Sequence, residues 1–187
     1  MIMVQVSDLS DETLVEKIIN DDQELFGEVV KRYQDKLERY ISRLGSSKEQ
    51  SQDIVQDSLI KTFKNLKSFN PKYKFSSWIY RIAHNEAINL FKKESKYQKF
   101  SFSDWLGEVL PSNVNVEEEV SDKIDLEQLK KKIDKLDLKY KDVLILYYLE
   151  EKKYKEISRI LKIPTSTVGI RLKRAKKQFK EICQANM

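Results

Sequence analysis

The residues with the clearest potential for chemistry lie near the C-terminal end, where positive charge coincides with helical periodicity. Residues 162–180, KIPTSTVGIRLKRAKKQFK, hold seven Lys or Arg and no acidic residue, whereas the whole chain has 35 basic and 30 acidic residues. Lys and Arg displace the counterions that condense on phosphate backbones, so this stretch favours binding to nucleic acid. The alternative is a basic helix face that contacts only solvent.

The residues around the start of this stretch provide the turn that a DNA-binding helix needs. A short helix over residues 154–161, a turn over 162–164 and a helix from Thr165 have the layout of a helix-turn-helix. The small side chain of Ser158 lets the two helices cross closely, and we expect Ile163 to be buried in the turn. This layout favours a DNA-binding helix over a basic helix that only contacts solvent.

Helical winding gives the last helix an inner and an outer face. At about 100° per residue, its apolar side chains gather on one face, namely Val168, Leu172, Ala175 and Phe179. The opposite face mixes hydroxyl, cationic and one apolar side chain, which can read base edges and a thymine methyl group in a major groove. The cations furthest from the helix start suit phosphate contacts better than sequence reading. The residues of this outer face are Ser166, Ile170, Lys173, Arg174 and Lys177.

The segment YKEISRILKIPTSTVGIRLKRAKKQF, residues 154–179, resembles the promoter-recognition segment of bacterial sigma factors of the sigma-70 family, in particular the small extracytoplasmic-function (ECF) type. In that family this helix reads the minus-thirty-five promoter element as duplex DNA. The contacts that the resemblance implies, carried over by position, are Thr165, Ser166, Thr167, Ile170, Arg171, Lys173 and Arg174.

Composition predicts that the elements positioning these residues are helices. The chain of 187 residues is 40% hydrophobic and contains only 4 Gly and 3 Pro, which favours long helices over a turn-rich β fold. Apolar residues recur at helical spacing over 26–44, with Gly45 placed to end that helix. A second helix is expected from about Lys48 to before Asn70, and a third from about Ser76, capped by Ser76 or Ser77. The chain is therefore expected to be all-α.

The second of these helices resembles the core-polymerase-binding helix of the same family, through SQDIVQDSLIKTF at residues 51–63. Its predicted core stripe consists of Val55, Leu59 and Phe63. An outward Ile60 flanked by carboxylates indicates a docking patch, although an exposed helix face without a partner is the alternative. The residues that the resemblance assigns to binding of RNA polymerase core are Gln52, Asp53, Gln56, Asp57 and Ile60.

The segment FNPKYKFSSWIYRIAHNEAINLFKK, residues 69–93, matches the promoter-melting region of the family. Opened DNA exposes base faces and charged strands, so a surface that binds it combines aromatic rings with cations. Tyr73 and Phe75 are candidates for capturing a flipped base of the minus-ten element. Trp78 is interpreted as either a core anchor or a stacking platform. The remaining candidates for this pocket, for phosphates or for base edges are Asn70, Lys72, Lys74, Arg81, His84, Asn85, Lys92 and Lys93.

Periodicity also predicts the division of the chain into two small helical domains joined by a flexible linker. The first, over 8–95, would bind core polymerase and recognise and melt the minus-ten element. Helical spacing fails over 96–119, where Gly, Pro, Ser and Asn concentrate, and this linker carries acidic residues that either mimic nucleic acid or serve solubility. The second domain, over 120–185, contains the helix-turn-helix.

The residues that most enzyme and metal sites need are scarce. His84 is the only His and Cys183 the only Cys, and no Gly-rich phosphate loop occurs, so we expect no catalytic residue, metal, cofactor or small-molecule substrate. A lone Cys and the absence of any apolar run of about 18 residues predict a cytoplasmic protein without membrane insertion. The resemblance also implies an anti-sigma factor as a partner, which could hold the chain at the membrane.

Two other classes of function are weighed against the resemblance. The first is a transcription regulator that binds duplex DNA through the helix-turn-helix and forms no complex with polymerase. The second is an interaction protein whose charged helices bind only proteins and which shows no salt-dependent DNA binding. The aromatic and cationic loop at residues 72–78 argues against both. We therefore expect a sigma factor that recruits core polymerase to a two-element promoter and helps to melt it.

Overall fold

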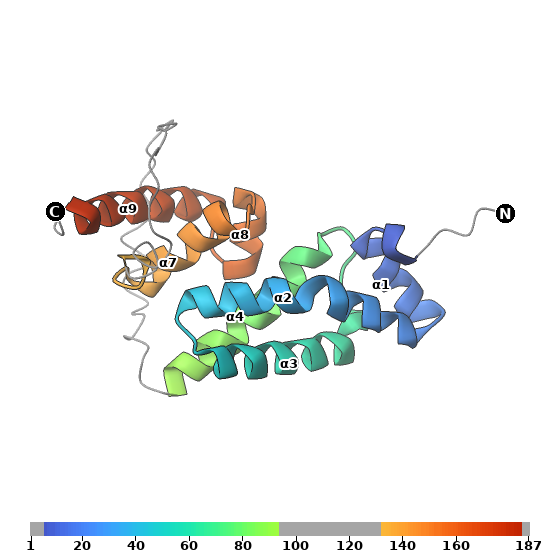
Figure 1. Cartoon of the computed structure of the whole chain (residues 1–187). Helices are drawn as coiled ribbons and strands as arrows, with labels where there is room; N and C mark the ends of the chain where they lie inside the picture. The colour runs from blue at the N-terminus through green and yellow to red at the C-terminus, as the bar shows by residue number, and fades with distance from the viewer. Residues whose placement is uncertain (1–5, 94–131, 185–187) are drawn as a thin grey trace. The chain divides into compact units, whose positions relative to one another are not determined.

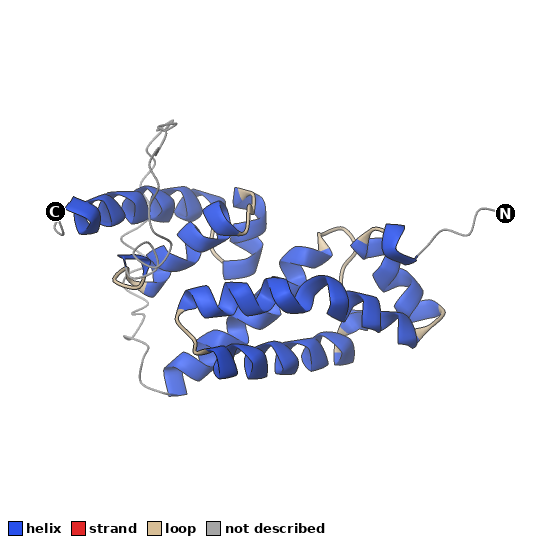
Figure 2. Cartoon of the chain, viewed as in Figure 1, coloured by secondary structure: helices blue, strands red, loops and turns tan. Residues whose placement is uncertain are grey.

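The computed structural model describes residues 6–93 and 132–184, which form helices joined by short turns (Figure 1). Within these two ranges no strand occurs (Figure 2), so the prediction of an all-α chain is confirmed. The chain divides into two compact units, of which the first contains residues 6–93 and the second most of residues 132–184. The predicted linker over 96–119 lies outside the described residues.

Helices of the N-terminal unit pack along their lengths. α2 packs on α3 and α3 packs on α4, and Figure 1 shows α2 and α3 running side by side. An ion pair between Lys61 of α3 and Glu86 of α4 links these two helices. The helices are α1 (Asp11–Asn20), α2 (Phe26–Leu44), α3 (Lys48–Lys64) and α4 (Phe75–Lys93), with 3-10 turns η1 (Val6–Asp8), η2 (Gln23–Leu25) and η3 (Leu66–Ser68).

The hairpin of α2 and α3 follows the predicted pattern. Gly45 has φ 116, a left-handed conformation that is nearly free for glycine, and it ends α2 after Leu44. α3 then begins with a capping box, in which the Ser47 hydroxyl accepts from the Gln50 amide and the Gln50 side chain accepts from the Ser47 amide. The stripe of α2 that is buried in the core is Val29, Tyr33, Leu37, Tyr40, Ile41 and Leu44.

α1 is a helix that the periodicity of the sequence did not single out. Ser10 caps it by accepting a hydrogen bond from the Thr13 amide, at 3.2 Å. Its buried face is short, comprising Leu14, Val15 and Ile18. Because ten residues with three buried side chains form a marginal helix alone, α1 depends on contacts with the rest of the bundle.

Two expectations for this unit are wrong. Phe63 was placed in the core stripe of α3, yet it is 41% exposed, and its ring meets the Phe26 ring of α2 edge-on with 5.0 Å between centroids. α4 begins at Phe75, and Ser77 is buried. The amide of Phe75 donates instead to Oε1 of Glu12 in α1, at 2.9 Å. The side chain that caps α4 therefore comes from another helix.

The C-terminal unit surrounds a smaller core. It contains α7 (Leu138–Leu144), a π-helical turn η4 (Ile145–Leu149), α9 (Thr165–Gln184) and α8 (Tyr154–Leu161) as far as Ser158, and α9 packs on α7. Of the predicted stripe on α9, Phe179 is only half-buried. The buried apolar side chains of α8 and α9 are Ile157, Ile160, Val168, Leu172 and Ala175.

Candidate nucleic-acid and polymerase interfaces

The turn between α8 and α9 is held by hydrogen bonds from one small residue. The hydroxyl of Ser158 donates to the carbonyl oxygen of Ile163 at 2.6 Å, and the Ile163 amide donates to the Ser158 carbonyl at 3.2 Å. Lys162 between them has a left-handed φ of 54, which reverses the chain direction. Ile163 is half-buried, not fully buried as expected. Two helices joined by this tight turn have helix-turn-helix geometry.

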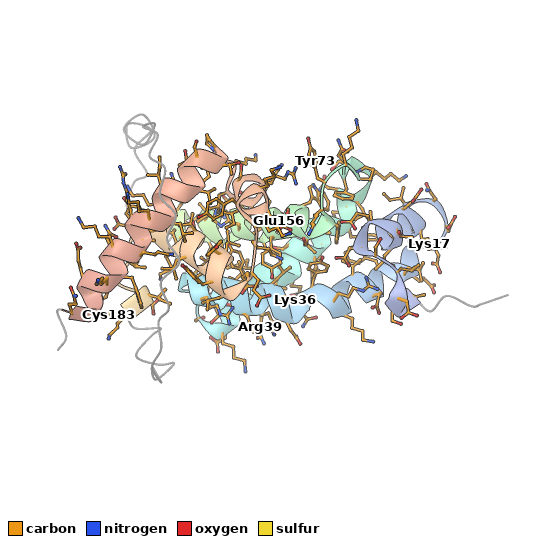
Figure 3. The ribbon with its side chains drawn as sticks, turned by 90° about the horizontal axis from the view of Figure 1, so that it is seen from above. Lys17, Lys36, Arg39, Tyr73, Glu156 and Cys183 are labelled. Carbon is orange, nitrogen blue, oxygen red and sulfur yellow. The ribbon has the colours of Figure 1, made fainter. Side chains whose placement is uncertain are left out.

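The first helix of this pair is fixed at its start by a buried acid. Oε2 of Glu156, which Figure 3 labels on α8, accepts a hydrogen bond from the Lys153 amide at 2.9 Å. Glu156 is buried, so this bond satisfies a carboxylate that would otherwise be costly to remove from water. The bond closes the first turn of α8.

The outer face of α9 carries hydroxyl and cationic side chains that are open to solvent. Ile170 lies among them but is half-buried. Lys177 approaches Glu181 at 4.0 Å, a contact between exposed side chains that contributes little stability. Side chains of this kind can donate to base edges and to phosphates. The exposed residues are Thr165, Ser166, Lys173, Arg174 and Lys177.

Two predicted contacts of α9 are corrected by their burial. Thr167 and Arg171, four residues apart on one side of the helix, are 2% and 5% exposed. Arg171 lies close enough to Asp142 of α7 for its charge to act on that carboxyl group. Burial raises the pKa of Asp142 to about 7, while the charges of Arg171 and Lys141 oppose the rise. Thr167 and Arg171 therefore hold α9 in its unit and do not face DNA.

The loop before α4 is a compact turn with an exposed aromatic ring. Oδ1 of Asn70 accepts from the Lys72 amide at 3.0 Å, and the Asn70 carbonyl accepts from the Tyr73 amide at 3.1 Å. Tyr73 is 48% exposed, and Figure 3 shows its side chain on this loop. Asn70, Lys72 and Lys74 are also exposed. The loop thus offers one ring and two cations at a defined position.

Phe75 was a candidate for base capture, and the structure corrects this. Its side chain is 0% exposed and packs against Tyr33 and Phe69, with ring centroids 5.6 Å and 5.4 Å away. Trp78, which is half-buried, contacts Phe69 and Phe75 at 5.6 Å and 5.7 Å. Phe75 is therefore a core residue, and Trp78 anchors the same cluster while part of its surface stays accessible.

His84 was expected to contact DNA but lies in the core of the N-terminal unit. Its Nδ1 shares a hydrogen bond with the Tyr40 hydroxyl at 3.0 Å, and burial lowers its pKa to about 4. The ring is therefore neutral at pH 7 and cannot hold a phosphate by charge. Among the other candidates on α4, Arg81 is half-buried, whereas Asn85, Lys92 and Lys93 are exposed.

The outer face of α3 is open along its length. Ile60 is 47% exposed and lies beside Phe63, which is 41% exposed, so apolar surface gathers at this end of the helix. Carboxylates and amides precede Ile60 on the same face. The predicted polymerase contacts, all exposed, are Gln52, Asp53, Gln56, Asp57 and Ile60.

A groove of about 610 Å³ lies between α2 and α3 beside this face. Its apolar walls are Phe26, Val30, Val55, Leu59, Ile60 and Phe63, and its polar rim is Gln34, Glu38, Gln52, Gln56 and Lys64. The sequence pattern assigned Phe63 to the core and placed Phe26 and Val30 in an apolar helical repeat, because apolar residues at helical spacing indicate burial whether the partner belongs to the same chain or to another. Their exposure toward a groove is visible only when the two helices are paired.

Other kinds of site receive no support within residues 6–93 and 132–184. In these ranges no group of three or more His, Cys, Asp or Glu side chains is placed to hold a metal ion. Among the described helices none has the length and apolar character required to cross a membrane.

Comparisons with known families match both units. The model of Sigma-70 region 2 matches residues 29–97, and that of Sigma-70, region 4 matches residues 126–179. The ECF RNA polymerase sigma factor SigW of Bacillus subtilis (strain 168) is 31% identical over 179 residues, which cover 89% of this chain and 93% of SigW. The ECF RNA polymerase sigma-E factor of Escherichia coli (strain K12) is 31% identical over 180 residues, covering 90% and 91%. This family is not known for enzymatic activity.

Solved structures share the fold. CnrH, in complex with the cytosolic domain of CnrY, aligns with a TM-score of 0.71 at 21% identity over 95% of this chain and 99% of CnrH. The sigma factor RpoE from Bartonella quintana, in complex with the anti-sigma factor NepR, aligns with a TM-score of 0.65 at 22% identity over 87% and 98%. With a helix-turn-helix in one unit, an exposed acidic helix in the other and matches to both sigma regions, this chain belongs to the ECF sigma factors of the sigma-70 family and acts in transcription initiation as an RNA polymerase sigma factor.

Proposed function

We propose that the chain divides the work of initiation among three surfaces. Residues 8–95 bind core polymerase through α3 and open the minus-ten element through the loop at 70–74 and α4. Residues 120–185 read the minus-thirty-five element through α9, and residues 96–119 connect the two. The observation that carries this proposal is the open face of α3, where Ile60 is 47% exposed beside an apolar groove. A regulator that uses only its helix-turn-helix has no need of such a face.

The polymerase contact follows helix-in-groove chemistry. The apolar walls of the groove would receive side chains of a helix from the polymerase, while Asp53 and Asp57 face outward beside it to meet cations. Burying apolar area contributes roughly 25 cal/mol per Å², so Ile60 and Phe63 are the main sources of affinity. The carboxylates contribute more to the rate of encounter and to specificity than to affinity.

The loop of residues 70–74 supplies what an unpaired base needs. Tyr73 presents a ring on which a base can stack, worth roughly 1–3 kcal/mol per base in single-strand binding proteins. Lys72 and Lys74 flank it and follow the backbone phosphates. Asn85, Lys92 and Lys93 extend the cationic surface along α4. Melting then draws on the affinity for the opened strand, because a protein that binds only the single-stranded state shifts the equilibrium toward it.

The outer face of α9 combines two kinds of DNA contact. Near the helix start, Ser166 and Thr165 offer hydroxyl groups to base edges, and Arg174 can form a bidentate contact with guanine. Lys177 lies one turn further along and suits phosphates, which set register without reading sequence. The half-buried Ile170 offers an apolar edge to a thymine methyl group.

An anti-sigma factor is the proposed regulator. The two solved relatives were determined as complexes, one with the cytosolic domain of CnrY and one with the anti-sigma factor NepR. The chain itself has one His and one Cys, and His84 is buried, so it has few groups of its own for sensing pH or oxidants. We place this chain in the cytoplasm, where such a partner could hold it at the membrane; co-purification of a single partner that blocks core binding would support this.

Transcription from a fragment library tests the proposal as a whole. The purified chain is mixed with core polymerase and genomic fragments, and the 5′ ends of the transcripts are sequenced. The expected result is a set of start sites that share two upstream elements and depend on the added chain. The absence of chain-dependent starts would refute the sigma mechanism, and starts without a shared upstream element would refute the role of α9.

A further inference from the structure

A single carboxylate connects α1 to the first residue of α4. Oε1 of Glu12 accepts a hydrogen bond from the Phe75 amide at 2.9 Å, across 63 residues of sequence. α1 lies at the end of the bundle where α4 begins (Figure 1). The contact is partly shielded from solvent, which strengthens a hydrogen bond to a charged acceptor. It therefore joins a helix with no assigned role to the helix that follows the minus-ten loop.

The local sequence cannot provide this cap. Lys74 occupies the position before α4, and its ammonium group has donors but no acceptor. Its carbonyl accepts from the amides of Ser77 and Trp78, at 3.1 Å and 3.4 Å. The Phe75 amide belongs to the same peptide group as that carbonyl and points away from it, so its acceptor has to come from elsewhere. A carboxylate at a helix N-terminus is also favoured by the helix dipole. Glu12 thus satisfies an amide in the first turn of α4, as Ser10 and Ser47 do in the first turns of α1 and α3.

The neighbouring residue of α1 fixes Glu12 in place. Asp11 pairs with Arg32 of α2, its Oδ1 lying 2.9 Å from Nη1, and it also accepts a hydrogen bond from the Tyr33 hydroxyl. The Arg32 guanidinium further donates to Oε1 of Glu28 and to the carbonyl oxygens of Val6, Ser7 and Leu9. Two adjacent carboxylates of α1 therefore reach two different helices, one holding α2 and the other capping α4.

The loop beside the cap is restrained at both ends. Phe69 precedes it and Phe75 follows it, and both rings are buried against each other with Trp78. Glu12 adds a backbone restraint at Phe75, two residues after Tyr73. Without that restraint the first turn of α4 can fray, since helix ends open easily when their amides lack acceptors. Fraying would lower the fraction of molecules whose Tyr73 stands in the binding geometry.

We propose that Glu12 is a positioning residue for minus-ten recognition, holding the first turn of α4 and thereby the Tyr73 loop in the conformation that receives the unpaired base. This inference rests on the proposed role of that loop. In this role Glu12 acts through the backbone of α4 and does not touch DNA itself. Its effect appears as a change in affinity for opened DNA, because the apparent dissociation constant rises as the competent fraction falls.

The experiment compares four variants in holoenzyme assembled from the full chain and core polymerase. Glu12→Ala removes the acceptor, Glu12→Asp keeps the charge but shortens the reach, and Glu12→Gln keeps an oxygen acceptor at the same reach. Glu16→Ala, an exposed glutamate one turn further along α1, is the matched control. The probe is the single-stranded non-template minus-ten oligonucleotide of a promoter mapped by the transcription assay, and a duplex carrying only the upstream element is the second probe.

We expect Glu12→Ala and Glu12→Asp to bind the single strand about three- to tenfold more weakly, the range that loss of a helix cap implies. Glu16→Ala should stay within about twofold of the original chain, because it lies away from the contact. Glu12→Gln should lose clearly less affinity than Glu12→Ala, because it keeps the acceptor and loses only the charge. Binding of core polymerase and of the upstream duplex should not change in any of the four. A general loss of folding would weaken all three interactions together, and that pattern would overturn the inference.

A fifth variant separates this inference from the proposed function. If Tyr73→Ala weakens single-strand binding and Glu12→Ala does not, the loop reads the minus-ten element and the positioning role of Glu12 is refuted alone. If Tyr73→Ala leaves single-strand binding intact, the role of the loop fails and the inference fails with it. A loss in Glu12→Gln equal to that in Glu12→Ala would also contradict the cap, because it would trace the effect to charge and not to the hydrogen bond.

Discussion

Nδ1 of His84 lies 3.0 Å from the hydroxyl oxygen of Tyr40, in the buried interior between α2 and α4. The rings of Tyr40 and Tyr80 pack beside this pair, with 5.3 Å between their centroids. The only His of the chain is therefore a structural group that joins two helices. Its burial lowers its pKa to about 4, against 6.5 for a solvated imidazole.

This pKa makes the N-terminal unit sensitive to acid. Between about pH 6.5 and pH 4 the unfolded chain binds a proton at His84 that the folded chain does not, so stability falls as the pH falls through this window. From pH 7 to pH 5 the loss at this site is about 2 kcal/mol. Urea unfolding of the original chain and of His84→Gln at both pH values measures it, since the difference between the two cancels the other titrating groups. Equal pH dependence in both chains would contradict the buried neutral imidazole.

Reversing the charge of Asp57 should block association with core polymerase. Asp57 lies on the exposed face of α3 with Ile60 and the groove, so an arginine there would meet the cations expected on the polymerase. We expect core affinity to fall by about tenfold or more, since like charges brought together in an interface cost several kcal/mol. Asp35→Arg, an exposed charge reversal on α2 outside the groove, is the control and should bind normally. Competition for core against labelled original chain gives both affinities.

Substitutions at Tyr73 and Phe75, only two residues apart, should affect different properties, namely DNA affinity for Tyr73 and folding stability for Phe75. Tyr73→Ala removes an exposed ring, so we expect normal thermal unfolding and a loss of roughly 1–3 kcal/mol in binding to single-stranded minus-ten DNA. Tyr73→Phe should keep most of that affinity, because the stacking face remains. Phe75→Ala removes a buried ring and should lower the free energy of unfolding by about 3–5 kcal/mol. Oligonucleotide titration and thermal unfolding of all three variants decide between these roles.

Sequence patterns predicted correctly those elements whose determining residues lie close together in the chain. The spacing of the apolar residues of α2, Gly45 after it, and the turn between α8 and α9 are all local, and each was predicted correctly. The open face of α3 was also predicted, since helical winding alone places Asp53, Asp57 and Ile60 away from Val55 and Leu59. No knowledge of the rest of the fold was needed for these features.

The errors concern side chains whose surroundings come from distant helices. Phe75 lies in an aromatic and cationic segment that suits DNA, and only the rings of Tyr33 and Phe69 show that it points inward. His84 was assigned to DNA with the cations and amides of the promoter-melting segment, but its partner Tyr40 lies 44 residues away. Glu12 gave no signal at all, because a cap supplied from another helix has no motif. Such contacts depend on tertiary packing, which a pattern within one segment does not contain.

Replacing Arg174 or Arg171 by alanine should have different effects although both are cations of α9: the first should weaken DNA binding and the second should lower stability. Arg174 is exposed on the outer face, so Arg174→Ala should weaken binding to duplex with the upstream element by about 1–3 kcal/mol and relax sequence preference at one base pair. Core association and thermal unfolding should stay normal, because the side chain lies outside the core and on a different unit from α3. Arg171 is 5% exposed and its charge acts on the buried Asp142 carboxyl, so Arg171→Ala leaves that group with only the charge of Lys141 opposing its burial and should instead destabilise the C-terminal unit. Upstream-duplex titration beside thermal unfolding distinguishes the two, and a selective loss of sequence preference in Arg171→Ala would return that residue to the DNA-binding face.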